Sequence, residues 1–230
     1  AVGELVAFLD SDDLWNSHKI EFQVERMIES DAVICCCGYE IFNSITGKAT
    51  GVVVNQEIDR VVRRWAALEG NGFAIGSTAL VRKDFLSQFG GFTLGIESSE
   101  DFELFWRAHS LGRIAYDKRV LVGYRTHGAQ SHRAFKVTVG NMTRIYDEII
   151  SFSEDMRFER RCRANLDAHY GYNLLRTGRI IEGFHWLWKS FCRDPRRVVT
   201  LPLHAIGRRL SRWLRVRLSP RRFFSPISGS

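Results

Sequence analysis

The chain has 230 residues, 45% of them hydrophobic and 26% charged, so it can bury a core and is too apolar for a disordered chain. Its formal net charge is +7, but residues 193–222 hold ten of the 33 Lys and Arg residues and a single acidic one. The remainder has 23 basic against 25 acidic residues, which excludes a general nucleic-acid-binding surface there, and we expect no specific nucleic-acid partner.

Cysteine usage and hydropathy favour a cytoplasmic protein. The five cysteines include the contiguous Cys35, Cys36 and Cys37, a spacing that suits neither a disulfide framework nor a metal site. No apolar run approaches the ~20 residues that a membrane-spanning helix needs, and the first residues lack the pattern of a signal peptide. We therefore expect a soluble or peripheral protein in a reducing compartment.

The first 54 residues alternate strand and helix patterns. The apolar run over residues 5–9 is typical of a buried strand in a parallel sheet, and an acidic cluster follows its carboxyl end. Next comes a helix that Asn16 or Ser17 can cap. Its predicted apolar face comprises Ile20, Val24, Met27 and Ile28. A buried strand over residues 32–37 and a hairpin of residues 39–42 and 51–54 complete this part.

The middle of the chain predicts a strand over residues 75–81, a turn at Gly90 and Gly91, and then an amphipathic helix. Ser98 is placed to cap that helix with Asp101 three residues on, and Gly112 can end it. Its apolar face would comprise Phe102, Phe105, Trp106 and His109, and short strands over 114–116 and 120–124 follow.

From residue 137 onward helical patterns replace strand patterns. Residues 168–195 resemble a single tetratricopeptide-like helical hairpin, and residues 201–218 form an amphipathic pattern with arginines mostly on one side. We therefore predict three parts, which are residues 1–136, a helical appendage over 137–195, and a basic amphipathic helix with a disordered tail over 196–230.

The acidic cluster is the first candidate site. Asp10 and Asp12, two positions apart just past a strand end, can point into one cleft and share Mg²⁺ or Mn²⁺. Such a cation would also neutralise a diphosphate leaving group. The alternative is that Asp12 and Asp13 only cap the following helix, and an isolated Asp-x-Asp pattern does not decide between them.

Four segments in this order resemble a family 2 glycosyltransferase of the GT-A fold. They are "GELVAFLDSDDLW", "GSTALVRKDFLSQFGGF", "SEDFELFWRAHSLG" and "YRTH", and the resemblance covers residues 1 to about 130. It implies an α/β fold, with a GT-A-like, partly Rossmann-like mixed sheet and flanking helices followed by the helical appendage. It further implies that the N-terminal part of the nucleotide-binding half is not in this sequence, which would leave an unpaired sheet edge.

The resemblance assigns roles to particular residues. Asp10 and Asp12, with Asp13 beside them, would bind the nucleotide-sugar donor and its metal ion. Asp101 would be the catalytic base, with Glu100 next to it, and the alternative for Asp101 is a capping-box partner of Ser98. His127 would complete the metal or diphosphate site, with His132 as a competitor. Gly76 and Ser77 would line the acceptor side, or would form only a tight strand entry.

The chemistry agrees with these roles. An inverting transfer needs one base to take the acceptor hydroxyl's proton, and a carboxylate in a first helical turn is favoured in its charged form by the helix dipole. A processive synthase is not supported, because Val61 stands where the Gln-x-x-Arg-Trp pattern requires Gln. A haloacid-dehalogenase-type phosphohydrolase is disfavoured by Leu14, since that class has Thr or Val two residues after its second aspartate.

We therefore predict a metal-dependent, inverting glycosyltransferase that uses a nucleotide-sugar and acts on a cell-surface polysaccharide or lipid-linked acceptor. The alternative is a truncated, catalytically inert module that binds a membrane or a partner. In either case the arginines of the tail, with Trp213, Phe223 and Phe224, fit a helix lying on an anionic membrane; the alternatives are an ordinary solvated helix face and a nonspecific polyanion-binding patch. That surface would be the inner face of the plasma membrane.

Overall fold

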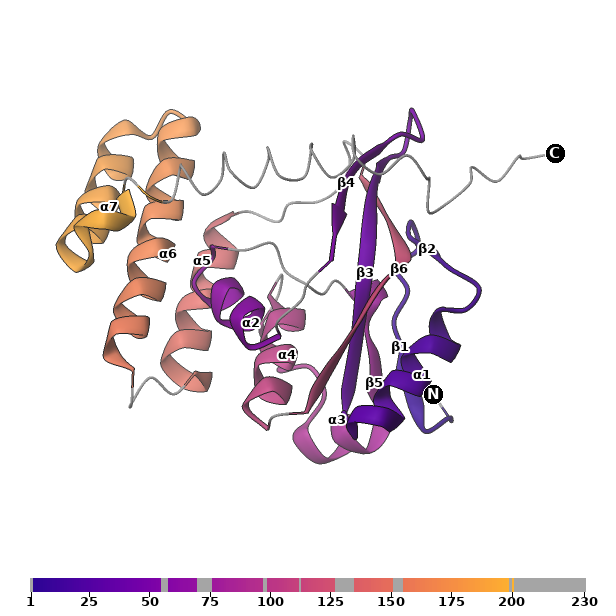
Figure 1. The fold of residues 1–230 in the computed structure, drawn as a ribbon. Coiled ribbons are helices and arrows are strands. Elements are labelled where there is room, and N and C mark those ends of the chain that lie inside the picture. Colours follow the sequence, from indigo (N-terminus) through magenta and orange to yellow (C-terminus); the bar gives the residue numbers. More distant parts are fainter. Residues whose placement is uncertain are drawn as a thin grey trace.

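The computed structural model describes residues 2–54, 58–69, 76–96, 99–111, 113–126, 135–150, 155–198 and 200 (Figure 1). Its strands are β1 (Leu5–Ala7), β2 (Leu14–Trp15), β3 (Ile34–Asn43), β4 (Ala49–Val53), β5 (Leu80–Arg82) and β6 (Ile114–Thr126). Its α-helices are α1 (Lys19–Ser30), α2 (Ile58–Ala66), α3 (Lys83–Phe89), α4 (Glu100–Ser110), α5 (Phe135–Arg144), α6 (Met156–Arg176) and α7 (Ile180–Arg193). A 3₁₀ turn, η1, covers Gly76–Thr78, and a π-helical turn, η2, covers Ile145–Ile149.

The strands form one mixed sheet in the order β1-β5-β3-β6-β2, with β4 also paired to β3. β3 is its centre, because β6 runs parallel along one edge while β5 and β4 pair antiparallel with successive parts of the other. Figure 1 shows α1 on one side of this sheet and α2 and α4 on the other. The predicted α/β architecture of a mixed sheet with flanking helices is therefore confirmed.

The two faces of β3 explain the run of adjacent cysteines. Cys35 packs towards α1 in a cluster with Met27, Leu80 and Ala115, whereas Cys36 joins the opposite cluster around Phe105. All three cysteines of the run are fully buried, and burial raises their thiol pKa values above the ordinary range. They act as small apolar residues on alternate sides of a strand.

The prediction for the first strand was partly wrong. β1 is a strand, but it covers only Leu5–Ala7, is half-buried, and pairs antiparallel with β5. Among the described strands β5 is its one partner, and Leu9 beyond its end is 51% exposed. Apolar composition indicated a strand correctly, but it carries no information about direction, which depends on the distant partner.

The predicted apolar face of α1 was also partly wrong. Ile20 and Ile28 are exposed, while the fully buried positions include Lys19 and Gln23 beside the nearly buried Met27. Gln23 Nε2 donates to the carbonyl oxygens of Cys35 at 2.8 Å and Thr78 at 2.9 Å. The buried face of α1 therefore includes polar side chains that satisfy backbone groups of β3 and η1.

Other element boundaries differ from the prediction, mostly because two predicted strands form one longer strand in the structure. The strand predicted over 32–37 and the first hairpin arm are one strand, β3, and the two strands predicted within 114–124 are one strand, β6. The segment predicted as a strand over 75–81 begins with the turn η1 before β5, and α3 was not predicted. Asn16 Oδ1 accepts from His18 N at 3.0 Å before α1, while Ser98 and Gly112 lie outside the described residues.

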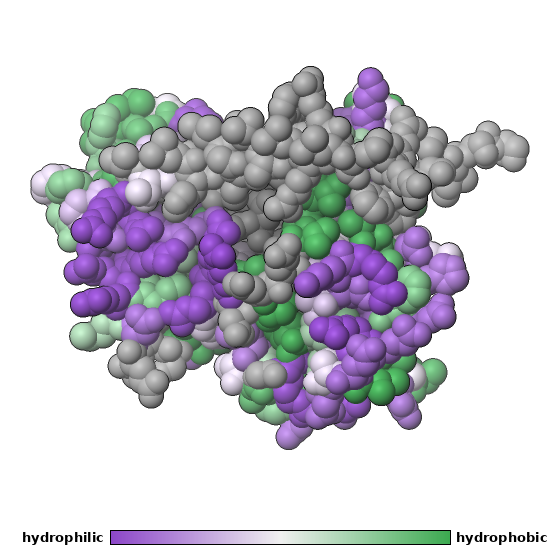
Figure 2. Space-filling view, in the orientation of Figure 1, coloured by the Kyte–Doolittle hydropathy of each residue, from purple (hydrophilic) through white to green (hydrophobic). Residues whose placement is uncertain are grey.

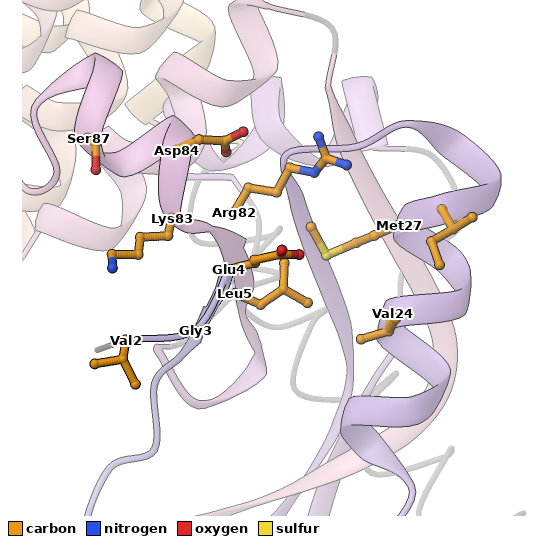
Figure 3. Close-up of a pocket in the computed structure, with 11 residues that line it drawn as sticks. Val2, Gly3, Glu4, Leu5, Val24, Met27, Arg82, Lys83, Asp84 and Ser87 are labelled. Atoms are coloured by element: carbon orange, nitrogen blue, oxygen red, sulfur yellow. The ribbon is translucent and has the colours of Figure 1, made fainter.

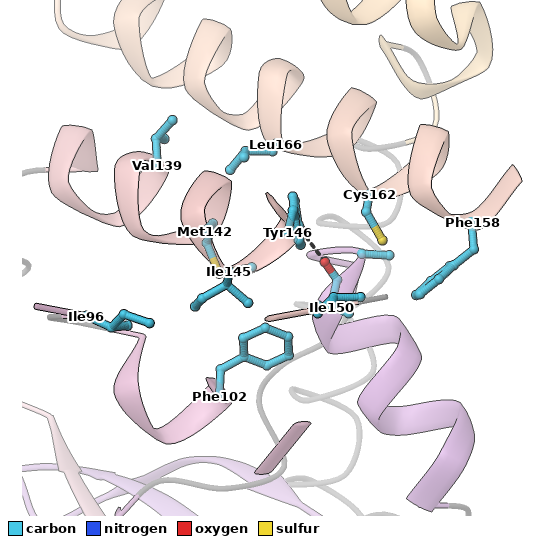
Figure 4. Close-up of a cluster of buried hydrophobic side chains, with 12 residues drawn as sticks. Ile96, Phe102, Val139, Met142, Ile145, Tyr146, Ile150, Phe158, Cys162 and Leu166 are labelled. Carbon is cyan, nitrogen blue, oxygen red and sulfur yellow. Dashed lines mark hydrogen bonds between the residues drawn. The ribbon is translucent and has the colours of Figure 1, made fainter. Parts of the chain in front are cut away.

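The C-terminal helices share a core with the rest of the chain. A buried cluster joins the end of α2 and Phe102 of α4 to α5, η2 and α6, and Tyr146 donates a hydrogen bond to the Ala66 carbonyl (Figure 4). α5 starts at Phe135, so the predicted boundary at 136/137 falls inside a helix. None of the described helices combines the length and the apolar character that crossing a bilayer requires.

Candidate active site

The loop after β1 carries the three clustered aspartates, and η1 holds it from one side. Asp10 N donates to Ser77 Oγ at 3.0 Å, and Trp15 Nε1 donates to the Ser77 carbonyl at 2.8 Å. Asp13 N closes the turn on the Asp10 carbonyl at 3.1 Å. Ser77 is fully buried, so its two hydrogen bonds fix both ends of the acidic loop.

Strand β6 holds the loop from the other side. Arg125 N donates to Asp13 Oδ1 at 3.0 Å, and Arg125 Nε donates to the Asp12 carbonyl at 2.6 Å. Asp13 is only 7% exposed, and its Oδ2 is buried without a hydrogen-bond partner among the described residues. The loop is therefore a rigid platform, in which Asp13 is an anchoring residue.

The other predicted acidic pair lies in the first turn of α4. Asp101 Oδ1 accepts from the backbone N of Phe102 at 2.7 Å. Glu100 Oε2 is buried and has no hydrogen-bond partner within the described part of the chain. A buried carboxylate oxygen without a donor is unfavourable, which points to a ligand or cation as its missing partner.

The two acidic groups lie close enough to interact electrostatically. Burial raises the pKa of Asp10, and the charges of Asp12 and Glu100 raise it further. Burial also raises the pKa of Asp101 to about 6, with Glu100 and Asp10 adding to the effect against the hydrogen bond from Phe102 N. Since each group shifts the other, residues about 90 positions apart in the sequence share one acidic surface.

The structure thus brings together most of the predicted site residues. Ser77 contacts the acidic loop directly, and a side chain at Gly76 would lie 3.9 Å from Asp10 Oδ1. His127 and His132 lie outside the described residues. The sequence analysis gave no role to Trp15 or Arg125, although both belong to the quoted motifs; the position of Trp15 beside the aspartates was a signal for Trp15, whereas Arg125 meets the loop only in the fold.

Comparison with known families identifies the segment that carries this loop. Residues 1–90 match the family model described as glycosyl transferase family 2. This segment is similar to glycosyl transferase family 2. The match contains Asp10, Asp12, Asp13, Gly76 and Ser77. The predicted family is therefore confirmed for the part of the chain that forms β1, the acidic loop and η1.

Curated relatives match part of the chain. An uncharacterized glycosyltransferase of Rickettsia typhi is 25% identical over 137 residues, which are 56% of this chain and 42% of the relative. The Escherichia coli protein WfgD, a UDP-Glc:alpha-D-GlcNAc-diphosphoundecaprenol beta-1,3-glucosyltransferase, is 44% identical over 50 residues, which are 21% of this chain and 20% of the relative. The chain therefore spans less than half the length of these relatives.

Solved structures confirm the GT-A-like fold. Staphylococcus aureus TarS residues 1–349 in complex with UDP-GlcNAc superpose with a TM-score of 0.52 at 16% identity, over 95% of this chain and 68% of TarS. TarS in complex with UDP gives the same TM-score at 17% identity. At this identity the likeness concerns the fold alone.

The carboxylates of the acidic loop, together with Glu100, fit a metal ion of one particular kind. The described residues contain no group of three or more His, Cys, Asp or Glu side chains arranged to hold a metal ion. However, Mg²⁺ is usually bound by one or two carboxylates together with substrate phosphates and water, not by an all-protein cage. Asp10 and Asp12, which interact with each other, and the unpartnered oxygen of Glu100 fit a cation that arrives with a diphosphate.

A cavity of about 660 Å³ lies beside the start of β1 (Figure 3). Leu5, Val24 and Met27 line it together with the charged side chains of Glu4, Arg82 and other residues at the start of α3. None of the predicted catalytic, metal-binding or substrate-binding residues lines it. This cavity is therefore distinct from the candidate active site.

A buried lysine lies directly behind the acidic loop. Lys19 is fully buried, and its Nζ lies 4.1 Å from the centroid of the Trp15 ring, an arrangement typical of a cation-π contact. Nζ has no hydrogen-bond partner in the described ranges, and burial lowers the pKa of Lys19. Trp15 in turn donates a hydrogen bond to the Ser77 carbonyl, so Lys19 packs against a residue that fixes the acidic loop.

The substitution Lys19→Met should increase the free energy of unfolding at pH 7 by about 1 kcal/mol, because methionine fills similar space without a buried charge. The folded-state pKa of Lys19 lies below its unfolded value, so the penalty is present at neutral pH and fades as pH rises towards 10.5. Urea unfolding at pH 7 and pH 10 measures both effects. The exposed Lys48→Met is the control, and a destabilised Lys19→Met would show that the ammonium group secures Trp15.

Proposed function

We propose that this chain supplies the residues that bind the acceptor and the donor's diphosphate in a metal-dependent, inverting glycosyltransferase. The donor is a nucleotide-sugar. The observation that carries the proposal is the proximity of the loop carboxylates to the α4 carboxylates, whose charges add to burial in raising the pKa values of Asp10 and Asp101. The match of residues 1–90 to the family 2 model supports the reaction class.

The proposed division of roles follows the local geometry. Asp10 and Asp12 face the diphosphate of the donor and would hold Mg²⁺ or Mn²⁺, which when bound neutralises the developing charge of the leaving diphosphate. Asp13 keeps the loop in place through the hydrogen bond that its Oδ1 accepts from Arg125 N. Gly76 leaves the space beside Asp10 open for substrate. His127 remains a predicted metal ligand.

Asp101 is the proposed base. Its carboxylate would take the proton of an acceptor hydroxyl while that oxygen bonds to the anomeric carbon, and the bond from that carbon to the diphosphate oxygen breaks on the opposite face. The diphosphate leaves with the electron pair of the broken bond, and Asp101 ends protonated. Glu100 would contact the donor or its cation through the oxygen that is otherwise unpartnered.

Donor binding tests this proposal. Calorimetric titration with UDP- and GDP-sugars in the presence of Mn²⁺ should show binding that EDTA abolishes, and Asp12→Asn should weaken it at least about tenfold. The matched control is Asp31→Asn, an 80% exposed aspartate beyond the far end of α1, which should bind as the wild type does. Absence of heat at millimolar donor would support the alternative of an inert, glycosyltransferase-like binding module.

We also infer an acceptor that is a glycan or a lipid-linked sugar, and a peripheral location on the cytoplasmic face of the plasma membrane. The WfgD relative, whose name specifies a diphosphoundecaprenol-linked acceptor, supports this class of acceptor. The ten Lys and Arg residues within 193–222 support attraction to anionic lipids. Sedimentation with anionic vesicles at low salt measures the association, and a protein that stays in the supernatant would contradict it.

A further inference from the structure

Helix α7 exposes an apolar stripe on the side that faces away from α6. Four large apolar residues line it at spacings of three, four and three, which places them on one helical face. The exposed fractions are 87% for Ile181, 62% for Phe184, 65% for Trp188 and 44% for Phe191. Trp188 and Phe191 stack with ring centroids 5.6 Å apart. Figure 2 shows apolar residues gathered at this end of the molecule, at the upper left.

The stripe cannot be hidden by a rotation of α7, because the opposite face is locked onto α6. Gly183 packs so closely that a Cβ atom there would lie 2.6 Å from Leu175 Cδ2. Ser190 Oγ donates to the Ala164 carbonyl at 2.7 Å, and Trp186 packs edge-on against Tyr170. Because α7 is fixed in this orientation, its exposed aromatic residues do not result from incomplete packing of a core. They indicate an interaction surface.

The charges around the stripe select the kind of partner. Residues 176–198 contain six Lys or Arg residues and two acidic residues, and Lys189 and Arg193 beside the stripe share a single carboxylate, that of Asp167 in α6. Contact with a second copy of the chain would place two surfaces with the same excess of positive charge against each other. An anionic lipid surface would instead complement it, while Trp and Phe side chains favour the boundary between headgroups and acyl chains.

We propose that the α7 stripe is a membrane-contact surface, in which Phe184, Trp188 and Phe191 enter the interface of an anionic bilayer. The net positive charge of residues 176–198 then attracts the anionic lipid headgroups. This inference goes beyond the basic tail, because it assigns the apolar part of the membrane contact to a folded helix. It does not depend on glycosyl transfer, so its failure would leave the proposed reaction untouched.

Cys192 gives a direct probe of this surface. It borders the stripe and is exposed, whereas the other four cysteines are buried, so a nitroxide reagent should label Cys192 selectively in the full chain. With vesicles of 30% phosphatidylglycerol in phosphatidylcholine (about 0.1 M salt), we expect the label to become more accessible to oxygen and less accessible to a water-soluble nickel chelate. Spin-spin broadening without vesicles, with no gain in oxygen accessibility, would indicate a second copy and overturn the proposal.

Matched substitutions separate the stripe from general surface hydrophobicity. Phe184→Ser combined with Trp188→Ser should weaken partitioning into these vesicles at least about tenfold, since each side chain contributes apolar area to the contact. The control combines Ile28→Ser and Ile45→Ser, which are 75% and 90% exposed in α1 and in the β3-β4 turn, and should partition as the wild type does. Equal sedimentation of stripe and control variants, with unchanged melting temperatures, would refute the proposal.

Discussion

The Asp101→Asn variant is expected to lose glycosyl transfer by about a thousandfold while it keeps the donor affinity of the wild type. Asparagine preserves the shape of the side chain and the hydrogen bond from Phe102 N, but it cannot accept the proton of an acceptor hydroxyl. Turnover measured in a transferase that contains this chain, together with calorimetric donor titration, separates the two effects.

Asp84→Asn is the matched control for this variant. Asp84 also lies in the first turn of a helix, and its Oδ1 accepts from the next backbone N, that of Phe85, at the same distance of 2.7 Å. Asp84 is exposed and lies outside the carboxylate group. Full turnover in Asp84→Asn is therefore expected. Retention of more than about a tenth of wild-type turnover in Asp101→Asn would rule out the base role.

The raised pKa of Asp101 makes the same role visible in the pH dependence. The base must be ionised, so kcat/KM should fall as pH drops below about 6, where Asp101 becomes protonated, and should level off above it. If the base were an aspartate with the ordinary pKa of 3.8, kcat/KM would begin to fall only near pH 3.8. The pH at which kcat/KM falls therefore measures the effect of burial and of the neighbouring charges of Glu100 and Asp10 on the pKa of Asp101. Donor and metal binding would lower the limb, because a nearby cation favours the carboxylate.

The same substitution, Asp101→Asn, should raise the free energy of unfolding at neutral pH although it lowers activity. Because the folded-state pKa of Asp101 lies above its unfolded value, this group's contribution to stability is greatest below pH 3.8 and is lost as pH rises through about 6. Asp101→Asn removes that loss, so without ligands it should stabilise the chain at pH 7 by on the order of 2 kcal/mol. A variant that is more stable and inactive is what a strained catalytic carboxylate predicts.

Local sequence patterns predicted the parts of this site that depend on neighbouring residues. The acidic loop after a strand and the acidic first turn of α4 could be placed from composition and spacing alone. Family resemblance then assigned their roles, because four motifs in a fixed order are more specific than any single one. What no pattern could give is that Asp10 and Asp101 influence each other, since that depends on how β1 and α4 meet in the fold.

The failures share a physical cause. The face of α1 was predicted from apolar residues, but Gln23 is buried because it satisfies carbonyl groups of Cys35 and Thr78, which are distant in sequence. Periodicity counts hydrophobic side chains and cannot detect a polar one whose partners lie elsewhere. The direction of β1 was missed in the same way, because its partner β5 lies more than 70 residues away.

The role of Glu69 could likewise not be predicted from the sequence, although its hydrogen bonds link the end of α2 to the C-terminal helices. It is 2% exposed and accepts from Arg161 Nε at 2.6 Å, Arg197 Nη1 at 2.9 Å and Asn165 Nδ2 at 3.0 Å. Burial alone would raise the pKa of Glu69, but these hydrogen bonds and the two guanidinium charges outweigh it and hold the pKa below its ordinary value. The ionised carboxylate is therefore the form that the fold requires.

The substitution Glu69→Ala should lower the free energy of unfolding at pH 7 by about 3 kcal/mol, because it leaves two guanidinium groups and an amide beside an empty buried position. Glu148→Ala is the control, since Glu148 pairs with Arg144 at the surface and such pairs contribute less than about 1 kcal/mol. Urea unfolding measures both. Wild-type stability should also decline as pH falls from 4.5 through the lowered pKa, and Glu69→Ala should lack this component.

The outcome bears on how the helical appendage is attached. The apolar cluster around Tyr146 and Phe158 already joins α5 and α6 to α2 and α4 (Figure 4). If that cluster alone held the helices, Glu69→Ala would match Glu148→Ala. If the Glu69 network fixes their orientation, the variant should in addition unfold in two steps, with α6 and α7 melting first, because Arg161 and Arg197 would lose their common partner. The orientation of the α7 stripe relative to the acidic loop would then depend on one buried carboxylate.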